Sequence, residues 1–166
     1  FTLLYKYIME VSIGGEFMER YEKQILFKEI ERDGQEKLLS KKAIIIGCGA
    51  LGTVIANNLV RSGVGYIKIV DRDYIEISNL QRQMLFDEND IKSDLPKAIA
   101  AKKKLDKINS SITIESSLID VNAKNIEGLC KGMDVILDAT DNLQTRYLIN
   151  DISIKLDIPW IYGEKI

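Results

Sequence analysis

The chain contains no histidine and only two cysteines and two prolines in its 166 residues. Because histidine is the side chain that most often exchanges protons near neutral pH, its absence excludes acid–base chemistry through an imidazole. Cys48 and Cys130 are far apart and form no CxxC pair, so we expect both to be structural, with no disulfide framework and no zinc site within this chain. Any reaction is therefore expected to depend on charge and positioning.

Long apolar runs are also missing. No stretch approaches the roughly 18 residues needed to span a bilayer, and residues 1–11 lack the long apolar core and small-residue cleavage site of a secretion signal. The 23 lysines and arginines nearly balance the 25 aspartates and glutamates, so no basic field gathers nucleic acid or anionic lipid. We expect a soluble cytoplasmic protein that binds neither nucleic acid nor membrane.

The length suits one domain. Residues 1–16 show no clear hydrophobic period, and Ser12-Ile13-Gly14-Gly15 is typical of a flexible joint. We therefore expect a flexible, appended tail over residues 1–16 and a single folded domain over residues 17–166.

Strands and helices are expected to alternate along this domain. Hydrophobic periodicity predicts helices over residues 16–27, 35–39, 50–62, 96–108, 123–130 and 142–156, and β-branched runs predict strands over residues 43–46, 66–71, 112–118, 133–138 and 159–162. Such alternation predicts a Rossmann-like, three-layer α/β fold with a mainly parallel sheet and helices on both faces. Ligands of such sheets bind at the carboxyl ends of the strands, where Gly47, Asp71 and Asp138 fall.

The first predicted strand leads directly into three spaced glycines. Gly47 suits a tight turn, Gly49 allows the backbone to approach a phosphate, and Gly52 allows close packing of helix on strand. The helix that follows directs its free N–H groups at the anion. Asp71 ends the second strand nineteen residues after Gly52, where such folds place the acid that binds ribose hydroxyls. Ordinary turn glycines and a solvated strand end are the alternative interpretations.

The charged residues beyond Asp71 favour ATP over NAD. Arg82 offers a planar fork of donors suited to phosphate, and Lys97 adds a second positive charge at the start of a predicted helix. Asp138 and Asp141 follow a buried strand, and carboxylate oxygens are natural partners of Mg²⁺. Alternatively, Arg82 and Lys97 are surface charges and Asp141 is a helix cap.

Several separated motifs, in this order, resemble the MoeB/ThiF/HesA family, the bacterial relatives of ubiquitin-activating enzymes. The resemblance covers about residues 17–163, and only the N-terminal adenylation part of the family is represented. The motifs are Arg20-Tyr21-Glu22-Lys23-Gln24, Asp33-Gly34-Gln35, Gly47-Cys48-Gly49-Ala50-Leu51-Gly52, Gly63-Val64-Gly65, Asp71, Ser78-Asn79-Leu80-Gln81-Arg82-Gln83, Pro96-Lys97 and Asp138-Ala139-Thr140-Asp141-Asn142.

The resemblance implies an ATP- and Mg²⁺-dependent adenylyltransferase. Members activate the C-terminal glycine carboxylate of a small ubiquitin-like sulfur carrier of the ThiS or MoaD type, which ends in Gly-Gly, and release pyrophosphate; the pathway is thiamin or molybdopterin synthesis. Members pair, so a homodimer is expected. An attack by a carboxylate on a phosphate needs charge stabilisation and alignment more than proton transfer, which suits a chain without histidine.

The resemblance also implies site residues. Arg82, Lys97 and Asp141 take the catalytic positions, and Asp141 is the Mg²⁺-associated carboxylate, acting through ATP. Arg20 and Lys23 are expected to reach the nucleotide of a partner subunit. The remaining nucleotide-binding candidates are Gly47, Gly49, Ala50, Gly52, Asp71, Asp73, Asn79, Gln83 and Asn142.

Three features depart from the family pattern. Lys23 stands where many relatives have a second arginine, and the segment between Arg82 and Pro96 is about two residues longer than in typical members. The last residues, Gly163-Glu164-Lys165-Ile166, fit the pattern poorly, so we expect a fragment with little activity alone. The alternatives are an NAD-dependent oxidoreductase, an inactive carrier-binding fragment, a peptide-antibiotic adenylase and an enzyme acting on tRNA threonylcarbamoyladenosine; for the last, Gln81 replaces a usual asparagine.

Overall fold

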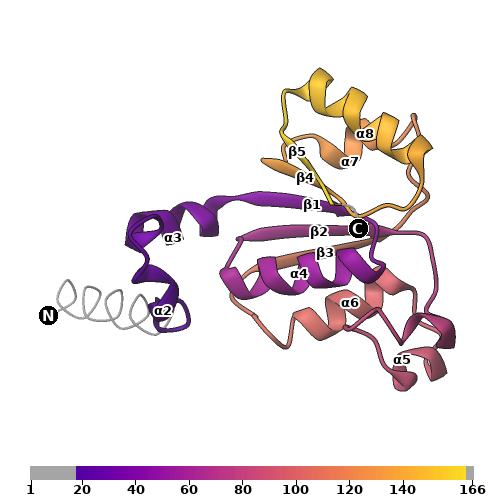
Figure 1. The fold of residues 1–166 in the computed structure, drawn as a ribbon, viewed down its shortest axis with the longest axis horizontal. Helices are drawn as coiled ribbons and strands as arrows, with labels where there is room; N and C mark the ends of the chain where they lie inside the picture. The colour runs from indigo at the N-terminus through magenta and orange to yellow at the C-terminus, as the bar shows by residue number, and fades with distance from the viewer. Residues whose placement is uncertain (1–17, 164–166) are drawn as a thin grey trace, which may run out of the picture.

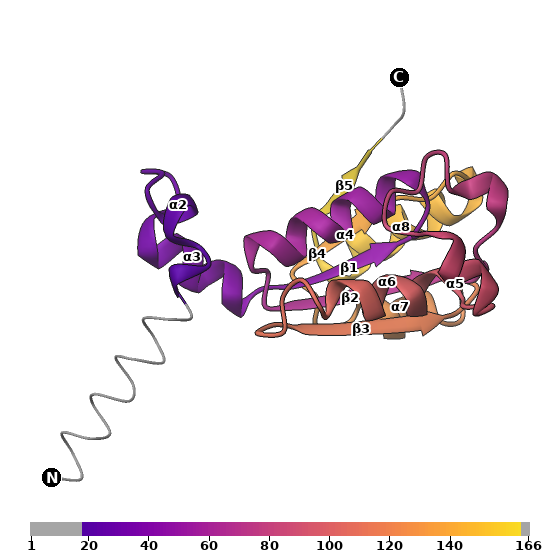
Figure 2. The same ribbon diagram turned by 90° about the horizontal axis from the view of Figure 1, so that it is seen from below.

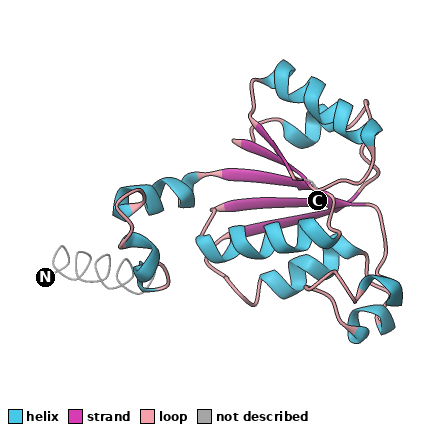
Figure 3. Ribbon diagram, viewed as in Figure 1, coloured by secondary structure: helices cyan, strands magenta, loops and turns pink. Residues whose placement is uncertain are grey.

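The structure, a computed structural model, describes residues 18–163. These residues form one sheet of five parallel strands in the order β3-β2-β1-β4-β5. Figure 3 shows the strands, in magenta, between helices on both sides of the sheet. The strands are β1 (Lys42–Ile46), β2 (Tyr66–Asp71), β3 (Thr113–Leu118), β4 (Val135–Asp138) and β5 (Trp160–Tyr162). Each predicted strand is confirmed within two residues, and the predicted Rossmann-like α/β class is confirmed.

The helices are α2 (Glu22–Ile25), α3 (Glu31–Ser40), α4 (Ala50–Ser62), α5 (Glu88–Lys92), α6 (Lys97–Leu105), α7 (Ile126–Cys130) and α8 (Leu143–Leu156), with a 3₁₀ turn, η1 (Ile77–Asn79). None of the helices in the described part is long and apolar enough to cross a bilayer. The tail expected over residues 1–16 and the last three residues lie outside the described residues.

Successive residues of the central strand β1 point to opposite faces of the sheet and enter two separate cores. Ala43 and Ile45 pack with α4 and α6, whereas Ile44 and Ile46 pack with α7 and α8. Because both faces are covered, all four residues are buried. Figures 1 and 2 show the resulting three layers, with α4 and α6 on one face and α7 and α8 on the other.

The strand order reverses direction at β1. The chain passes from β1 to β2 and β3 on one side, then returns to β4 and β5 on the other. In open parallel sheets of this order, the crevice at the carboxyl ends of the two strands flanking the reversal is where ligands bind. Here it is bordered by the turn after β1 and the turn after β4.

The N-terminal region differs from the prediction of one helix over residues 16–27. In its described part the chain turns at Arg20 and Tyr21 before α2 begins. Tyr21 is buried, and its hydroxyl accepts a hydrogen bond from Asn109 Nδ2 at 2.9 Å. The tertiary contacts of one tyrosine therefore override an unbroken helical period.

The helix predicted over residues 35–39 begins earlier, at Glu31, so Gly34 lies inside α3. The Gly34 N–H donates to the carbonyl of Ile30 at 2.7 Å. The adjacent Gln35 is fully buried, where its Nε2 donates to the carbonyl of Ser62 at 3.0 Å. This anchoring of Gln35 offsets the low helix propensity of glycine.

The longer segment between Arg82 and Pro96 contains α5, which was not predicted. Asp87 begins it with a capping box: the Asp87 carboxylate accepts from the N–H groups of Asn89 and Asp90, and the Asp90 carboxylate accepts from the N–H of Asp87. The next helix, α6, ends at Leu105, three residues before the predicted end.

Candidate functional site

A cleft of about 910 Å³ opens at the carboxyl ends of the strands, where the strand order reverses. This volume lies within the range of small-molecule binding sites. Most of the predicted nucleotide-binding residues line it, namely Gly47, Gly49, Ala50, Asp71, Asp73, Asn79, Arg82, Gln83, Lys97, Asp141 and Asn142. The fold thus gathers residues from five separate segments.

Each of the three glycines in the turn after β1 is glycine for a different structural reason. Gly47 has a φ of +97°, and a Cβ there would lie 2.6 Å from the carbonyl oxygen of Ala139. A Cβ at Gly52, which is not among the cleft residues, would collide with the carbonyl of Gly47. At Gly49 the nearest protein atom to such a Cβ is Gln83 Nε2, at 3.9 Å. Packing therefore requires Gly47 and Gly52, whereas the space at Gly49 faces the cleft.

Asp71 is held in a fixed orientation at the end of β2. Its Oδ2 accepts from the Cys48 N–H at 2.6 Å, and its Oδ1 accepts from the Asp73 N–H at 2.7 Å. Burial raises the pKa of the Asp71 carboxyl, against the lowering effect of these two N–H groups and of Lys97. The Cys48 thiol is fully buried in the same turn, and its burial raises its pKa. A structural role for this cysteine agrees with that burial.

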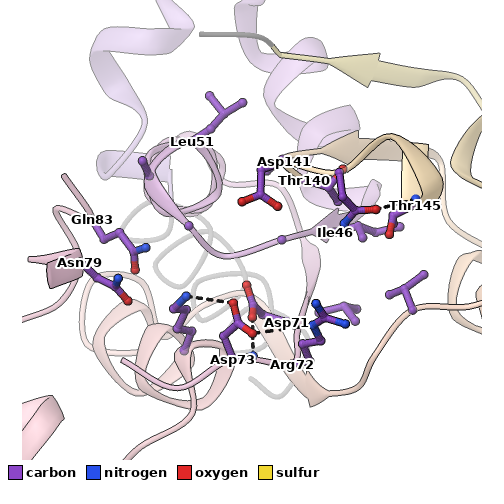
Figure 4. Close-up of a pocket in the computed structure, with 18 of the residues that line it drawn as sticks. Ile46, Leu51, Asp71, Arg72, Asp73, Asn79, Gln83, Thr140, Asp141 and Thr145 are labelled. Carbon is purple, nitrogen blue, oxygen red and sulfur yellow. Dashed lines mark hydrogen bonds and ion pairs between the residues drawn. The ribbon is translucent and has the colours of Figure 1, made fainter. Parts of the chain in front are cut away.

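Lys97 begins α6 and is buried, with 7% of its surface exposed. Its Nζ lies 3.2 Å from Asp73 Oδ2, and its N–H donates to the Asp73 carbonyl at 2.9 Å. The extra residues in the preceding segment therefore do not displace Lys97 from the cleft. Figure 4 shows Asp73 and Asp71 beside the glycine turn.

Residues 79–83, which begin with the last residue of η1, contribute one exposed cation and two buried amides. Arg82 is exposed, and its Nη1 donates to the Ser78 carbonyl at 2.9 Å. Asn79 Oδ1 accepts from the Glu76 N–H at 3.2 Å. Gln83 is 3% exposed, and its Oε1 has no hydrogen-bond partner among the described residues. An unpaired buried amide oxygen beside the cleft is a position at which a bound ligand would supply a donor.

The turn after β4 brings two carboxylates to different environments. Asp138 is fully buried and accepts from the Thr140 N–H at 2.9 Å and the Thr140 hydroxyl at 2.7 Å. Asp141 is exposed at the cleft. The cap of α8 is Asn142, whose Oδ1 accepts from the Thr145 N–H at 2.8 Å, so the alternative of Asp141 as the helix cap is wrong. Asp141 is therefore the carboxylate open to a ligand.

Within residues 18–163, no group of three or more acidic or cysteine side chains could hold a metal ion by itself. A Mg²⁺ ion held by the exposed Asp141 carboxylate would need further oxygen ligands, such as those of a nucleotide's phosphates.

Arg20 and Lys23 are not in this cleft. Arg20 Nη1 donates to the carbonyl of Ile108 at 2.8 Å, and Lys23 pairs with Glu22 at 3.2 Å. Both line a separate, shallow pocket of the N-terminal region, next to Phe27 and Ile30. A contact with the nucleotide of a partner subunit stays a prediction for both.

Several residues of the cleft were not predicted from the sequence. They are polar or aromatic side chains that follow strands or begin helices, namely Arg72, Asp120, Thr140, Thr145, Arg146 and Tyr162. A buried acid such as Asp138 needs a countercharge, so the burial of Asp138, which the structure shows, is what draws attention to Arg146. Its position in the first turns of the following helix is the signal that could have found it.

Comparison with known proteins identifies the family of the chain. The profile of the ThiF family matches residues 21–166. The chain belongs to the ThiF family. This ThiF-family chain is 50% identical to the sulfur carrier protein ThiS adenylyltransferase of Bacillus subtilis (strain 168) over 144 residues. The aligned region covers 87% of the chain and 43% of the relative.

Two solved structures resemble this ThiF-family chain. E. coli MccB in complex with ATP aligns with a TM-score of 0.71 and 29% identity, over 80% of the chain and 39% of MccB. E. coli tRNA N6-threonylcarbamoyladenosine dehydratase, in complex with AMP, aligns with a TM-score of 0.80 over 91% of the chain and 62% of that protein, but at 19% identity it shares the fold alone. The chain spans about half the length of the curated relatives it matches.

Proposed function

We propose that this protein uses ATP and Mg²⁺ to adenylate the C-terminal glycine carboxylate of a small ubiquitin-like sulfur carrier ending in Gly-Gly. The observation that carries the proposal is the convergence of Gly49, Asp71, Arg82 and Lys97 on one cleft at the strand-order reversal. The names of its relatives, sulfur carrier adenylyltransferases at 50% and 40% identity, support the carrier as substrate, for thiamin or molybdopterin synthesis.

The residues suit a reaction at the α-phosphate. Asp71 accepts hydrogen bonds from the ribose, the open backbone at Gly49 admits the phosphates, and Arg82 and Lys97 stabilise their charge. The carrier's carboxylate oxygen forms a bond to the α-phosphorus as the bond to the β-phosphate oxygen breaks, which gives an acyl-adenylate and pyrophosphate. Such a displacement depends on alignment and electrostatic stabilisation, which these residues supply without histidine.

Mg²⁺ fits beside Asp141, where it would neutralise phosphate charge. Asn79, Gln83, Asp73, Ala50 and Asn142 are proposed to complete the nucleotide site.

We further propose a cytoplasmic homodimer. Cys48 and Cys130 are both free and buried, as is usual in a reducing compartment. Arg20 and Lys23 lie outside the chain's own cleft, so a nucleotide contact by either would need a second subunit.

Two measurements test the proposal. Thermal unfolding with ATP–Mg²⁺ and with NAD separates the two nucleotides, because a ligand that binds only the folded state raises the melting temperature; we expect ATP–Mg²⁺ alone to do so. Exchange of labelled pyrophosphate into ATP is expected to require a carrier ending in Gly-Gly, with the same carrier lacking its final glycine as the matched control. Stabilisation by NAD alone, or exchange that ignores the final glycine, would contradict the proposal.

A further inference from the structure

Asp138 is a fully buried carboxylate with one satisfied and one unsatisfied oxygen. Its Oδ1 accepts both hydrogen bonds from Thr140, whereas its Oδ2 has no hydrogen-bond partner in the described part of the chain. Oδ2 instead lies 3.5 Å from Nε of Arg146. A buried carboxylate without a nearby positive charge would be strongly destabilising, so the position of Asp138 depends on this arginine.

One guanidinium connects three structural elements. Arg146 lies in α8, its Nη2 is 3.5 Å from the carbonyl oxygen of Thr140, and its Cζ lies 4.0 Å above the ring centroid of Tyr162, at the end of β5. Arg146 therefore contacts the end of β4, the turn that follows it, and the end of β5. A cation stacked on an aromatic face is held in place more firmly than an exposed one.

The Asp141 side chain has no contact with another described residue that would fix its position. No hydrogen bond or ion pair holds the Asp141 carboxylate within residues 18–163, and the side chain is exposed. Its placement is set by the backbone on either side. On one side the Thr140 N–H donates a hydrogen bond to Asp138, and on the other side Asn142 caps α8. Arg146 secures the Thr140 side of this turn.

We propose that Arg146 is a positioning residue that holds the turn of residues 139–142 so that the Asp141 carboxylate faces the cleft. This inference rests on the proposed function, since it assigns Arg146 an effect on Mg²⁺-dependent nucleotide binding that is exerted through Asp141. The chemistry has no step at Arg146 itself.

The test compares Arg146→Gln and Arg146→Lys with Lys155→Gln, a control on the same helix that removes a surface ion pair with Glu127. The first readout is hydrogen exchange of the Thr140 amide without nucleotide, which we expect to be about tenfold faster in Arg146→Gln because its acceptor Asp138 loses its countercharge. The second is the Mg²⁺ concentration needed for half-maximal ATP binding, expected to rise roughly five- to tenfold through misplacement of Asp141.

The Mg²⁺ readout separates positioning from a merely structural role. Arg146→Lys, which keeps the charge and loses the fork, is expected to fall between wild type and Arg146→Gln, and Lys155→Gln is expected to match wild type. If Arg146→Gln does not fold, the Mg²⁺ concentration that Arg146→Lys needs for half-maximal ATP binding tests the proposal instead.

An unchanged Mg²⁺ requirement in the Arg146 variant that folds would overturn the inference, even with faster exchange at Thr140, and leave the proposed function intact. Failure of the wild type to bind ATP at any Mg²⁺ concentration would refute both.

Discussion

The Lys97 ammonium lies 3.2 Å from the Asp73 carboxylate, and the two differ sharply in exposure. The Lys97 side chain is 9% exposed, whereas the Asp73 side chain is 57% exposed. Because water solvates Asp73 well, a polyphosphate can replace it as the partner of Lys97 without leaving a buried charge uncompensated. Lys97 is therefore held at the cleft in the absence of nucleotide by a partner that is readily exchanged.

Replacing Lys97 with methionine is expected to weaken ATP binding roughly ten- to hundredfold, as expected for the loss of a charge-assisted hydrogen bond. The methionine fills similar space, so folding should persist. Titration calorimetry with ATP and with adenosine checks this: adenosine affinity is expected to stay at the wild-type value, since adenosine carries no phosphate. Equal losses for both ligands would show that Lys97 does not act on phosphate.

The glycine turn offers a matched pair of variants. In Gly49→Ala the added methyl meets no protein atom closer than 3.9 Å, so the melting temperature is expected to stay near wild type while ATP binding is lost. In Gly52→Ala the methyl would collide with the carbonyl of Gly47, so the fold itself is expected to be destabilised by about 1–3 kcal/mol. Full ATP binding by Gly49→Ala would exclude close approach of a phosphate there.

Asp71 gives the site a pH dependence. Burial raises the pKa of its carboxyl above the usual value of about 4, and protonation removes the charge and turns one acceptor oxygen into a donor, which weakens hydrogen bonds from the ribose hydroxyls. Affinity for adenosine is therefore expected to be fully present above the raised pKa and lost as the pH falls through it, earlier than for an ordinary aspartate. Asp71→Asn is the control, and its affinity should lack this step. An identical profile in both proteins would contradict the role of Asp71 in ribose binding.

The strands β1, β2 and β4 were predictable because they are short runs rich in β-branched residues, and each is flanked or ended by glycine or aspartate. Ile44, Ile45 and Ile46 are all buried, although they point alternately to the two faces of the sheet. A short run of apolar residues that are all buried is typical of a central strand in a parallel sheet covered on both faces. The site residues that end these strands, such as Asp71, followed from the same pattern, because the carboxyl ends of parallel strands meet at one edge.

Residues whose role depends on distant contacts were not predictable in the same way. Tyr21 interrupts a helical period because Asn109, 88 residues later, provides its partner. Gly34 lies in a helix because the neighbouring Gln35 donates a hydrogen bond to the carbonyl of Ser62, at the end of α4. Arg146 carries no local motif, and its importance appears only once Asp138 is known to be fully buried.

The central claim is that charged residues of this cleft activate a carboxylate at the α-phosphate of ATP. Arg82 is exposed and its side chain makes a single hydrogen bond among the described residues, to the Ser78 carbonyl, so Arg82→Ala should fold normally. Arg61→Ala, which removes an exposed arginine from the far end of α4, is the matched control.

The most direct measurement is carrier-dependent exchange of labelled pyrophosphate into ATP by the wild type and these two variants. We expect exchange to fall roughly 10²- to 10³-fold in Arg82→Ala, the usual cost of removing one positioned donor to a transition state, and to stay at the wild-type rate in Arg61→Ala. Near-normal exchange by a folded Arg82→Ala would contradict the account.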